Sequence, residues 1–107
     1  MAKYLVLWRQ NPAAPTPTTP SENLQLNEMM FAAIDDLMAR GEIEEFGFFS
    51  DGRSGYVIGK GETIDSFRNV SMFLPYVYSE VHEIIPYKKG KETLITLLKT
   101  MTELAKK

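Results

Sequence analysis

Histidine is the side chain that most readily exchanges a proton near neutral pH, and this chain has a single one, His82. It lies in the segment FLPYVYSEVHEIIPY, with Glu80 and Glu83 close to it in sequence. A histidine beside a carboxylate can act as a general base, so His82 is the candidate catalytic residue. Side chains alternate along a strand, so Glu80 shares a face with His82 and Glu83 does not. The competing interpretation is a structural or exposed histidine.

Aromatic side chains are the second group that could serve a function, by binding rather than by reaction. A gap between a sheet and its helices, lined by aromatic rings, would suit a flat organic ligand. The candidate ligand-binding residues are therefore Tyr4, Trp8, Phe46, Tyr56 and Tyr78, with Arg53 as a possible partner for an anionic group. The alternative is that the same rings pack a core or a dimer interface.

Several chemistries are excluded by composition. The chain has no cysteine, so a disulfide, a thiolate metal site and a cysteine nucleophile are all ruled out. One histidine with scattered carboxylates does not make a zinc or copper site. GKGE, residues 59–62, lacks the spacing of a phosphate-binding loop. We therefore expect neither a metal nor a cofactor.

The 107 residues predict a single domain spanning 1–107, with a globular composition of 44% hydrophobic and 24% charged residues. Residues 1–87 carry six Lys or Arg against twelve Asp or Glu, whereas residues 88–107 carry six Lys against two Glu. An acidic body argues against a nucleic-acid partner. No segment approaches the ~20 apolar residues of a membrane span, and no signal peptide is recognisable. We expect a cytoplasmic protein without a membrane partner.

The first half of the chain predicts a strand, a loop and a helix. Residues 3–9 are apolar on both alternating sets, which is typical of a strand buried on both faces. Residues 12–20 form a proline-rich surface loop. An amphipathic helix follows, capped by Ser21 and ended by Gly41.

The second half predicts a hairpin, a helix, a strand and a last helix. Residues 43–49 form a charged edge strand, Asp51 and Gly52 a turn, and residues 55–59 a strand apolar on both faces. Thr63 caps a helix that Pro75 ends near Leu74. After a turn over 76–79 come a strand over 81–85 and an apolar-striped helix over 91–106.

This order of elements predicts a ferredoxin-like α+β fold. Its β-α-β-β-α-β unit has a four-stranded antiparallel sheet with the first and third strands at the centre. Two helices cover one sheet face and leave the other apolar and open. A second copy would cover that face in a homodimer. The alternative cover is the C-terminal helix, folded back onto its own subunit.

The chain resembles the dimeric α+β-barrel superfamily, and within it the muconolactone-isomerase-like proteins or a branch of small proteins of uncharacterised activity. The similarity rests on GEIEEFGFFSDGRSGYVIGKG as a central hairpin and on TIDSFRNVSMFLPYVYSEVHEIIP as a helix that returns to a final strand. It implies the fold and dimerisation. Members include isomerases, cofactor-free monooxygenases and haem-degrading enzymes. The haem-degrading branch uses a helical histidine, whereas His82 falls on a predicted strand.

Two functions follow as hypotheses. In the first, a homodimer binds a small aromatic or polyketide-like molecule and acts as a cofactor-free isomerase or monooxygenase, with His82 transferring the proton. In the second, the protein is a non-enzymatic interaction or regulatory module whose aromatic surface serves only assembly.

Overall fold

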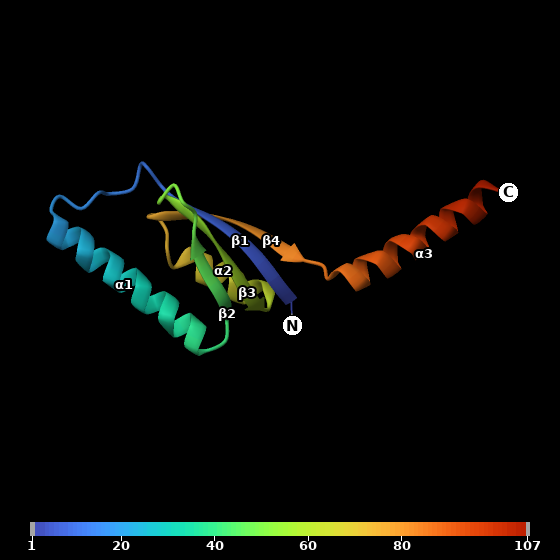
Figure 1. Cartoon of the computed structure of the whole chain (residues 1–107), viewed down its shortest axis with the longest axis horizontal. Helices are drawn as coiled ribbons and strands as arrows, with labels where there is room; N and C mark the ends of the chain where they lie inside the picture. Colours follow the sequence, from blue (N-terminus) through green and yellow to red (C-terminus); the bar gives the residue numbers. More distant parts are fainter. Residues whose placement is uncertain (1, 107) are drawn as a thin grey trace.

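The computed structural model describes residues 2–106 of the chain. It is an α+β structure with one four-stranded antiparallel sheet and three helices (Figure 1). In chain order the elements are β1 (Ala2–Gln10), α1 (Pro20–Ala39), β2 (Ile43–Phe48), β3 (Ser54–Gly61), α2 (Thr63–Ser71), β4 (Val77–Ile84) and α3 (Tyr87–Ala105).

The strand order is β2-β3-β1-β4, so β3 and β1 are the central strands, as the sequence predicts. Both are apolar on their two faces, which suits strands with neighbours on each side. The charged strand β2 lies at one edge, also as predicted. Its pairing with β3 shifts between Ile43 and Glu45, and such an irregularity helps to keep an edge from pairing with another chain.

Tight turns form where glycine allows a left-handed backbone. α1 ends at Ala39, and Gly41 follows with a φ of 77°. In the β2–β3 hairpin, Gly52 has a φ of 74°. Asp51 Oδ1 accepts hydrogen bonds from the backbone N–H groups of Arg53 and Ser54, at 2.9 and 3.2 Å. These bonds lower the pKa of Asp51 from its usual value.

The two helix caps were predicted one or two positions too late. Thr19, not Ser21, caps α1, and its side-chain oxygen accepts from the backbone N–H of Glu22 at 3.1 Å. Pro20 occupies the first helical turn, where its missing N–H costs no hydrogen bond. α2 is capped by Glu62 rather than Thr63, because Asp65 returns a bond to the Glu62 backbone N–H at 3.1 Å.

Three boundaries in the second half also differ from the sequence prediction. α2 ends at Ser71 rather than Leu74. β4 already begins at Val77, where a turn was predicted, because β1 extends to Gln10 and pairs with Val77. α3 begins at Tyr87 rather than residue 91, because Pro86 can precede a first helical turn.

The register divides the sheet residues between two faces that differ in character. Tyr4, Val6 and Trp8 point to one face and are all buried. We call this the helix face, because α1 and α2 lie over it. The opposite, open face has Leu5 and Leu7 at its centre, both half-buried. Each lies beside a β3 residue and a β4 residue in the register.

The open face is apolar only at its centre, which corrects the sequence prediction of a wholly apolar surface. Around the leucines, Glu44 pairs with Lys3 at 3.3 Å and with Lys60 at 2.9 Å. These two lysines lower the pKa of Glu44, chiefly through the hydrogen bond from Lys60.

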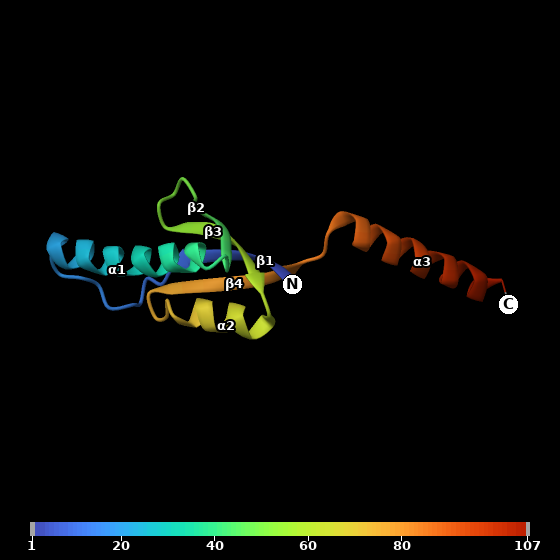
Figure 2. The same ribbon diagram turned by 90° about the horizontal axis from the view of Figure 1, so that it is seen from below.

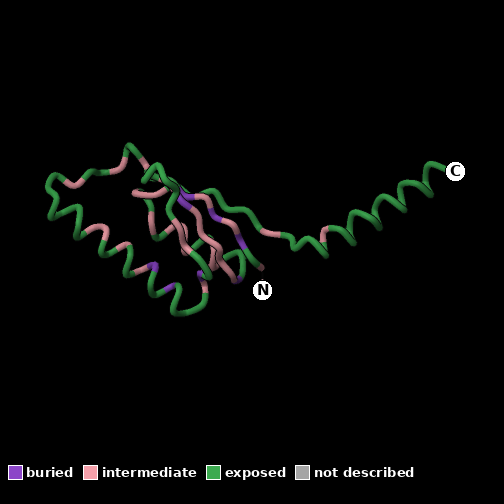
Figure 3. The backbone as a smooth tube through the Cα atoms, viewed as in Figure 1, coloured by how far each residue is buried: buried purple, intermediate pink, exposed green. Residues whose placement is uncertain are grey.

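α3 does not fold back over the open face, which was the alternative cover considered from sequence. It extends away from the sheet in both views (Figures 1 and 2). The Cα radius of gyration is 19.1 Å, against about 13 Å for a compact chain of this length. Burial is confined to the sheet and to Ile34 and Leu37 of α1, and α3 has no buried residue (Figure 3).

Candidate ligand cleft

A cleft of about 390 Å³ separates the helix face of the sheet from α1 and α2. It exists because α1 packs on the sheet only through its C-terminal half, where Leu37 is 0% exposed. Towards its N-terminal half α1 stands off, with Leu24 60% exposed. The volume lies in the range of small-molecule sites in proteins.

The aromatic part of the cleft is built around Trp8. Its ring stacks on Phe46 with centroids 5.5 Å apart and meets Phe48 edge-on at 5.7 Å. Phe31 of α1 reaches Phe48 edge-on at 6.2 Å. These offset and edge-on contacts are the arrangements that aromatic rings prefer. The cluster presents ring faces and edges that a flat ligand can contact.

A glycine in β3 makes this cluster possible. Gly55 lies directly opposite Trp8 in the register, and the indole passes over it towards β2. A Cβ at Gly55 would lie 2.5 Å from the Trp8 ring and 2.1 Å from the backbone oxygen of Gly47. The glycine therefore provides the space in which the indole of one strand crosses β3 to reach Phe46 and Phe48.

Two buried polar atoms belong to residues that line the cleft. Trp8 Nε1 and Asn69 Oδ1 have no hydrogen-bond partner within residues 2–106. Trp8 is only 8% exposed. A buried polar atom without a partner costs free energy, and native proteins keep few of them. One donor and one acceptor are therefore left without a partner at the wall of the cleft.

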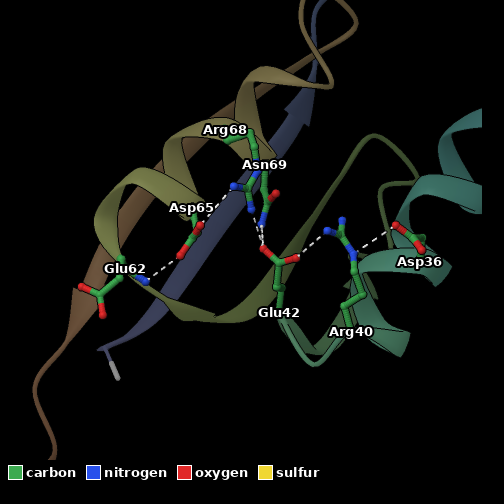
Figure 4. Close-up of polar contacts among 7 residues, drawn as sticks. All are labelled: Asp36, Arg40, Glu42, Glu62, Asp65, Arg68 and Asn69. Carbon is green, nitrogen blue, oxygen red and sulfur yellow. Dashed lines mark hydrogen bonds and ion pairs between the residues drawn. The ribbon is translucent and has the colours of Figure 1, made fainter.

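A network of charges fixes the helices at one end of the cleft (Figure 4). Glu42 accepts from Arg68 of α2 at 2.8 Å and from Asn69 Nδ2 at 3.2 Å. Arg40, at the end of α1, reaches the other oxygen of Glu42 at 3.1 Å and Asp36 at 3.1 Å. The carboxylate of Glu42 thus joins the end of α1 to α2 and holds the amide of Asn69 in place.

The sheet register separates the residues that the sequence predicted as one site. Tyr4, Trp8 and Phe46 line the cleft. His82, Tyr56 and Tyr78 are on the open face, because they pair with Leu5, Leu7 and Arg9 rather than with Tyr4, Val6 and Trp8. Arg53 is exposed in the hairpin turn.

His82 and Glu80 do touch on the open face. His82 Nε2 lies 3.4 Å from Glu80 Oε2, with the histidine side chain 54% exposed. Nearby, the guanidinium of Arg9 lies 5.9 Å from the centre of the Tyr78 ring. His82 is therefore an exposed residue on the face opposite to the cleft.

Tyr56 on the open face has a raised pKa. Its hydroxyl donates to Glu45 Oε2, which raises the pKa of Tyr56 above its usual 10.0, with smaller contributions from desolvation and the Glu45 charge. The phenol is favoured over the phenolate, so its stabilising contribution is present below about pH 10 and is lost as pH rises through the raised pKa.

We expect Glu45→Gln to shift the tyrosinate absorbance titration of Tyr56 to lower pH, because the charged acceptor is removed. Glu44→Gln is the matched control, since its carboxylate faces Lys3 and Lys60 instead. Equal curves for wild type and Glu45→Gln would contradict the assignment.

Sequence reasoning missed Asn69, Phe31 and Glu42. Phe31 and Asn69 lie on helices, and no sequence pattern distinguishes them from ordinary helix residues. Glu42 lies between Gly41, where the first helix was predicted to end, and the edge strand predicted from residue 43, and no role was assigned to it. The one clue to Glu42 was its place just after the predicted end of the first helix, since a residue there can bridge that helix to its neighbours.

Comparison with known proteins adds no identification: no protein-family model matches the chain, and no curated protein matches it. Within residues 2–106, no cluster of three histidine or carboxylate side chains is arranged to hold a metal ion. In the same range, no helix combines the length and apolar character needed to cross a membrane. The function must therefore be argued from the cleft and the surfaces.

Proposed function

We propose that the protein binds a flat, largely apolar organic molecule, such as an aromatic or polyketide-like compound, in the cleft between the sheet and α1 and α2. The observation that carries this proposal is the combination of cleft and polar atoms. A cavity of about 390 Å³ is lined by Trp8 and Phe46, while Trp8 Nε1 and Asn69 Oδ1 lack partners within the described residues. Few, well-placed polar groups among apolar walls are typical of ligand sites.

The proposal is for binding rather than for proton transfer by His82. His82 lies on the opposite sheet face from Trp8, so a ligand in the cleft is separated from it by the sheet itself. An isomerase or monooxygenase reaction would need a base that reaches the cleft. Glu42 lines it, but its carboxylate is engaged by Arg40 and Arg68.

The homodimer predicted from sequence is retained as a proposal, with pairing through the open face. Its half-buried centre of Leu5 and Leu7 inside a ring of charged pairs has the apolar core and polar rim of protein interfaces. The central position of β1 and β3 supports a ferredoxin-like fold and kinship with the dimeric α+β-barrel superfamily.

The second candidate function is a module that serves only assembly. It is favoured by α3, whose apolar side chains are exposed along the whole helix. The two candidates differ in what the cleft does: it takes up a ligand in the first and stays without one in the second.

Fluorescence of Trp8, the only tryptophan, tests binding directly. We expect 2-naphthol and 5-hydroxy-1,4-naphthoquinone to quench it saturably, with dissociation constants of about 1 to 100 μM for molecules of this size. Cyclohexanol, which has no flat ring, is the ligand control.

A variant that fills the cleft makes the test specific. Gly59 lines the cleft, and an added Cβ there would meet only the Glu42 backbone oxygen at 3.5 Å. Gly59→Val should weaken naphthol binding at least about tenfold. Ile58→Val, one residue away and on the other face, should bind as wild type does. Val57→Phe is a second filling variant. Unchanged affinity in both, with native circular dichroism, would refute binding in the cleft.

A further inference from the structure

α3 has an apolar stripe that nothing in its own subunit covers. Its leucine and methionine side chains are between 51% and 62% exposed at Leu94, Leu97, Leu98, Met101 and Leu104. The spacing of three and four residues places them on one side of the helix. Lys89 and Lys91 flank this stripe near the start of the helix. We call it the α3 stripe.

A matching apolar surface lies on the other side of the molecule, between α1 and the edge strand β2. It is a shallow groove of about 290 Å³, with Asp35 at its rim. The other residues that line it are Phe31, Ile34, Met38, Phe46 and Phe48. Leu24, Phe31 and Met38 recur every seven residues along α1 and are 60%, 42% and 40% exposed. A helix laid beside α1 would contact all three.

The charges of the two surfaces are complementary. Residues 20–39 contain four acidic and no basic residues, whereas residues 88–107 contain six lysines and two glutamates. Glu28 and Asp35 are spaced along α1 next to the exposed apolar residues, and Lys89 and Lys91 border the α3 stripe. Opposite charges at the rim of an apolar contact favour one partner and one register.

We propose that the α3 stripe of each subunit docks into the α1–β2 groove of a second copy of this chain, in a reciprocal exchange of C-terminal helices. α3 runs antiparallel to the partner's α1 in this arrangement, which brings Lys89 and Lys91 towards the acidic C-terminal half of that helix. It also opposes the two helix dipoles.

The connection between β4 and α3 disfavours the same contact within one subunit. Only residues 85 and 86 separate the two elements, and Pro86 restricts the backbone there. α3 leaves from one end of the sheet, and α1 lies towards the other end (Figures 1 and 2). Folding α3 onto its own α1 would require it to reverse direction within these two residues and cross the whole sheet.

The contact area is adequate for a stable dimer. At 19 residues α3 is about 28 Å long and matches the 20-residue α1. Each half-exposed leucine offers roughly 100 Å² of apolar surface. Reciprocal exchange covers both stripes and both grooves, which approaches the roughly 1,600 Å² of a standard interface.

This inference deepens the homodimer of the proposed function by adding a second contact between subunits to the open-face pairing. The groove shares Phe31, Ile34, Phe46 and Phe48 with the lining of the ligand cleft. Because α1 also forms one wall of the cleft, docking of the partner's α3 would hold that helix in place. Absence of naphthol binding would leave the exchange intact, and absence of the exchange would leave ligand binding testable in the same protein.

Zero-length carbodiimide cross-linking of the full chain tests the exchange. An equal mixture of isotope-labelled and unlabelled protein is refolded together, cross-linked and digested, and the linked peptides are identified by mass spectrometry. We expect links from Lys89 or Lys91 to Asp35, with mixed-isotope pairs as abundant as random pairing of copies allows. Links that join only peptides of one isotope would place α3 on its own subunit and overturn the proposal.

Two α3 variants provide the matched comparison. Leu97→Lys places a charge in the α3 stripe, whereas Thr96→Lys places it on the side of the helix away from the stripe, at a residue that is also exposed. We expect Leu97→Lys to reduce the mixed-isotope links at least about tenfold and Thr96→Lys to leave them unchanged. Equal effects of the two variants would overturn the proposal, as would links that form only on anionic vesicles, which would assign the stripe to a membrane surface. Circular dichroism of both variants checks that they keep the fold.

Discussion

We expect Gly55→Ala to lower the free energy of unfolding by about 3 kcal/mol, a large share of the 5–15 kcal/mol of a typical domain. The added methyl would lie 2.1 Å from the Gly47 backbone oxygen and 2.5 Å from the Trp8 ring. The first contact involves backbone of the neighbouring strand, so rotation of a side chain cannot relieve it. The second displaces Trp8 from Phe46. Urea denaturation followed by circular dichroism measures the loss.

Gly59→Ala is the matched control in the same strand. Its Cβ would have only one neighbour, the Glu42 backbone oxygen, at an ordinary 3.5 Å. We expect it to be neutral or to stabilise by a few tenths of a kcal/mol, because alanine restricts the unfolded chain more than glycine does. Equal costs at the two positions would mean that Trp8 does not cross β3 at Gly55.

We also expect Leu37→Ala to lower the free energy of unfolding by about 3 kcal/mol, because Leu37 is the one large side chain of the described residues that is fully buried. Leu37 and Ile34 hold the C-terminal half of α1 on the sheet. Loss of Leu37 therefore loosens the wall of the cleft as well as the core. We expect weaker naphthol binding together with a lower denaturation midpoint, both measured on the same protein.

Met29→Ala is the control for this prediction. Met29 lies on the same helix but is 63% exposed. Its truncation should change stability by less than about 0.5 kcal/mol. If Met29→Ala were as costly as Leu37→Ala, the N-terminal half of α1 would have to be packed in solution, and the cleft would be closed.

The identity of most elements followed from local patterns. The two-sided apolar strand at residues 3–9 became the central strand β1, and Gly41 ended α1 in a left-handed conformation. The proline-rich loop, the Asp51–Gly52 turn and both amphipathic helices follow from the same short-range signals. The ends of the elements were predicted less accurately than their types. β4 begins at Val77 rather than at the predicted residue 81, because β1 offers it backbone partners as far as Gln10.

The candidate site was predictable only in part. Tyr4, Trp8 and Phe46 were chosen as aromatic residues beside a sheet, and all three line the cleft. His82, Tyr56 and Tyr78 were chosen by the same reasoning and lie on the other face. Their residue types carried no information about this difference. Side chains alternate between two faces within each strand, but the sequence does not say which of the two faces meets the helices.

The sequence by itself determined which segments are strands and helices, where glycine and proline end them, and that β1 and β3 are apolar enough to be central. Only the tertiary structure decided that β1 and β4 pair with Leu5 opposite His82. A shift of one residue in that pairing would have placed His82 opposite Tyr4 or Val6, on the helix face that lines the cleft, because side chains alternate with a period of two. The direction of α3 was likewise decided by contacts between distant parts of the chain, since an amphipathic stripe specifies that a helix needs a partner without specifying which one.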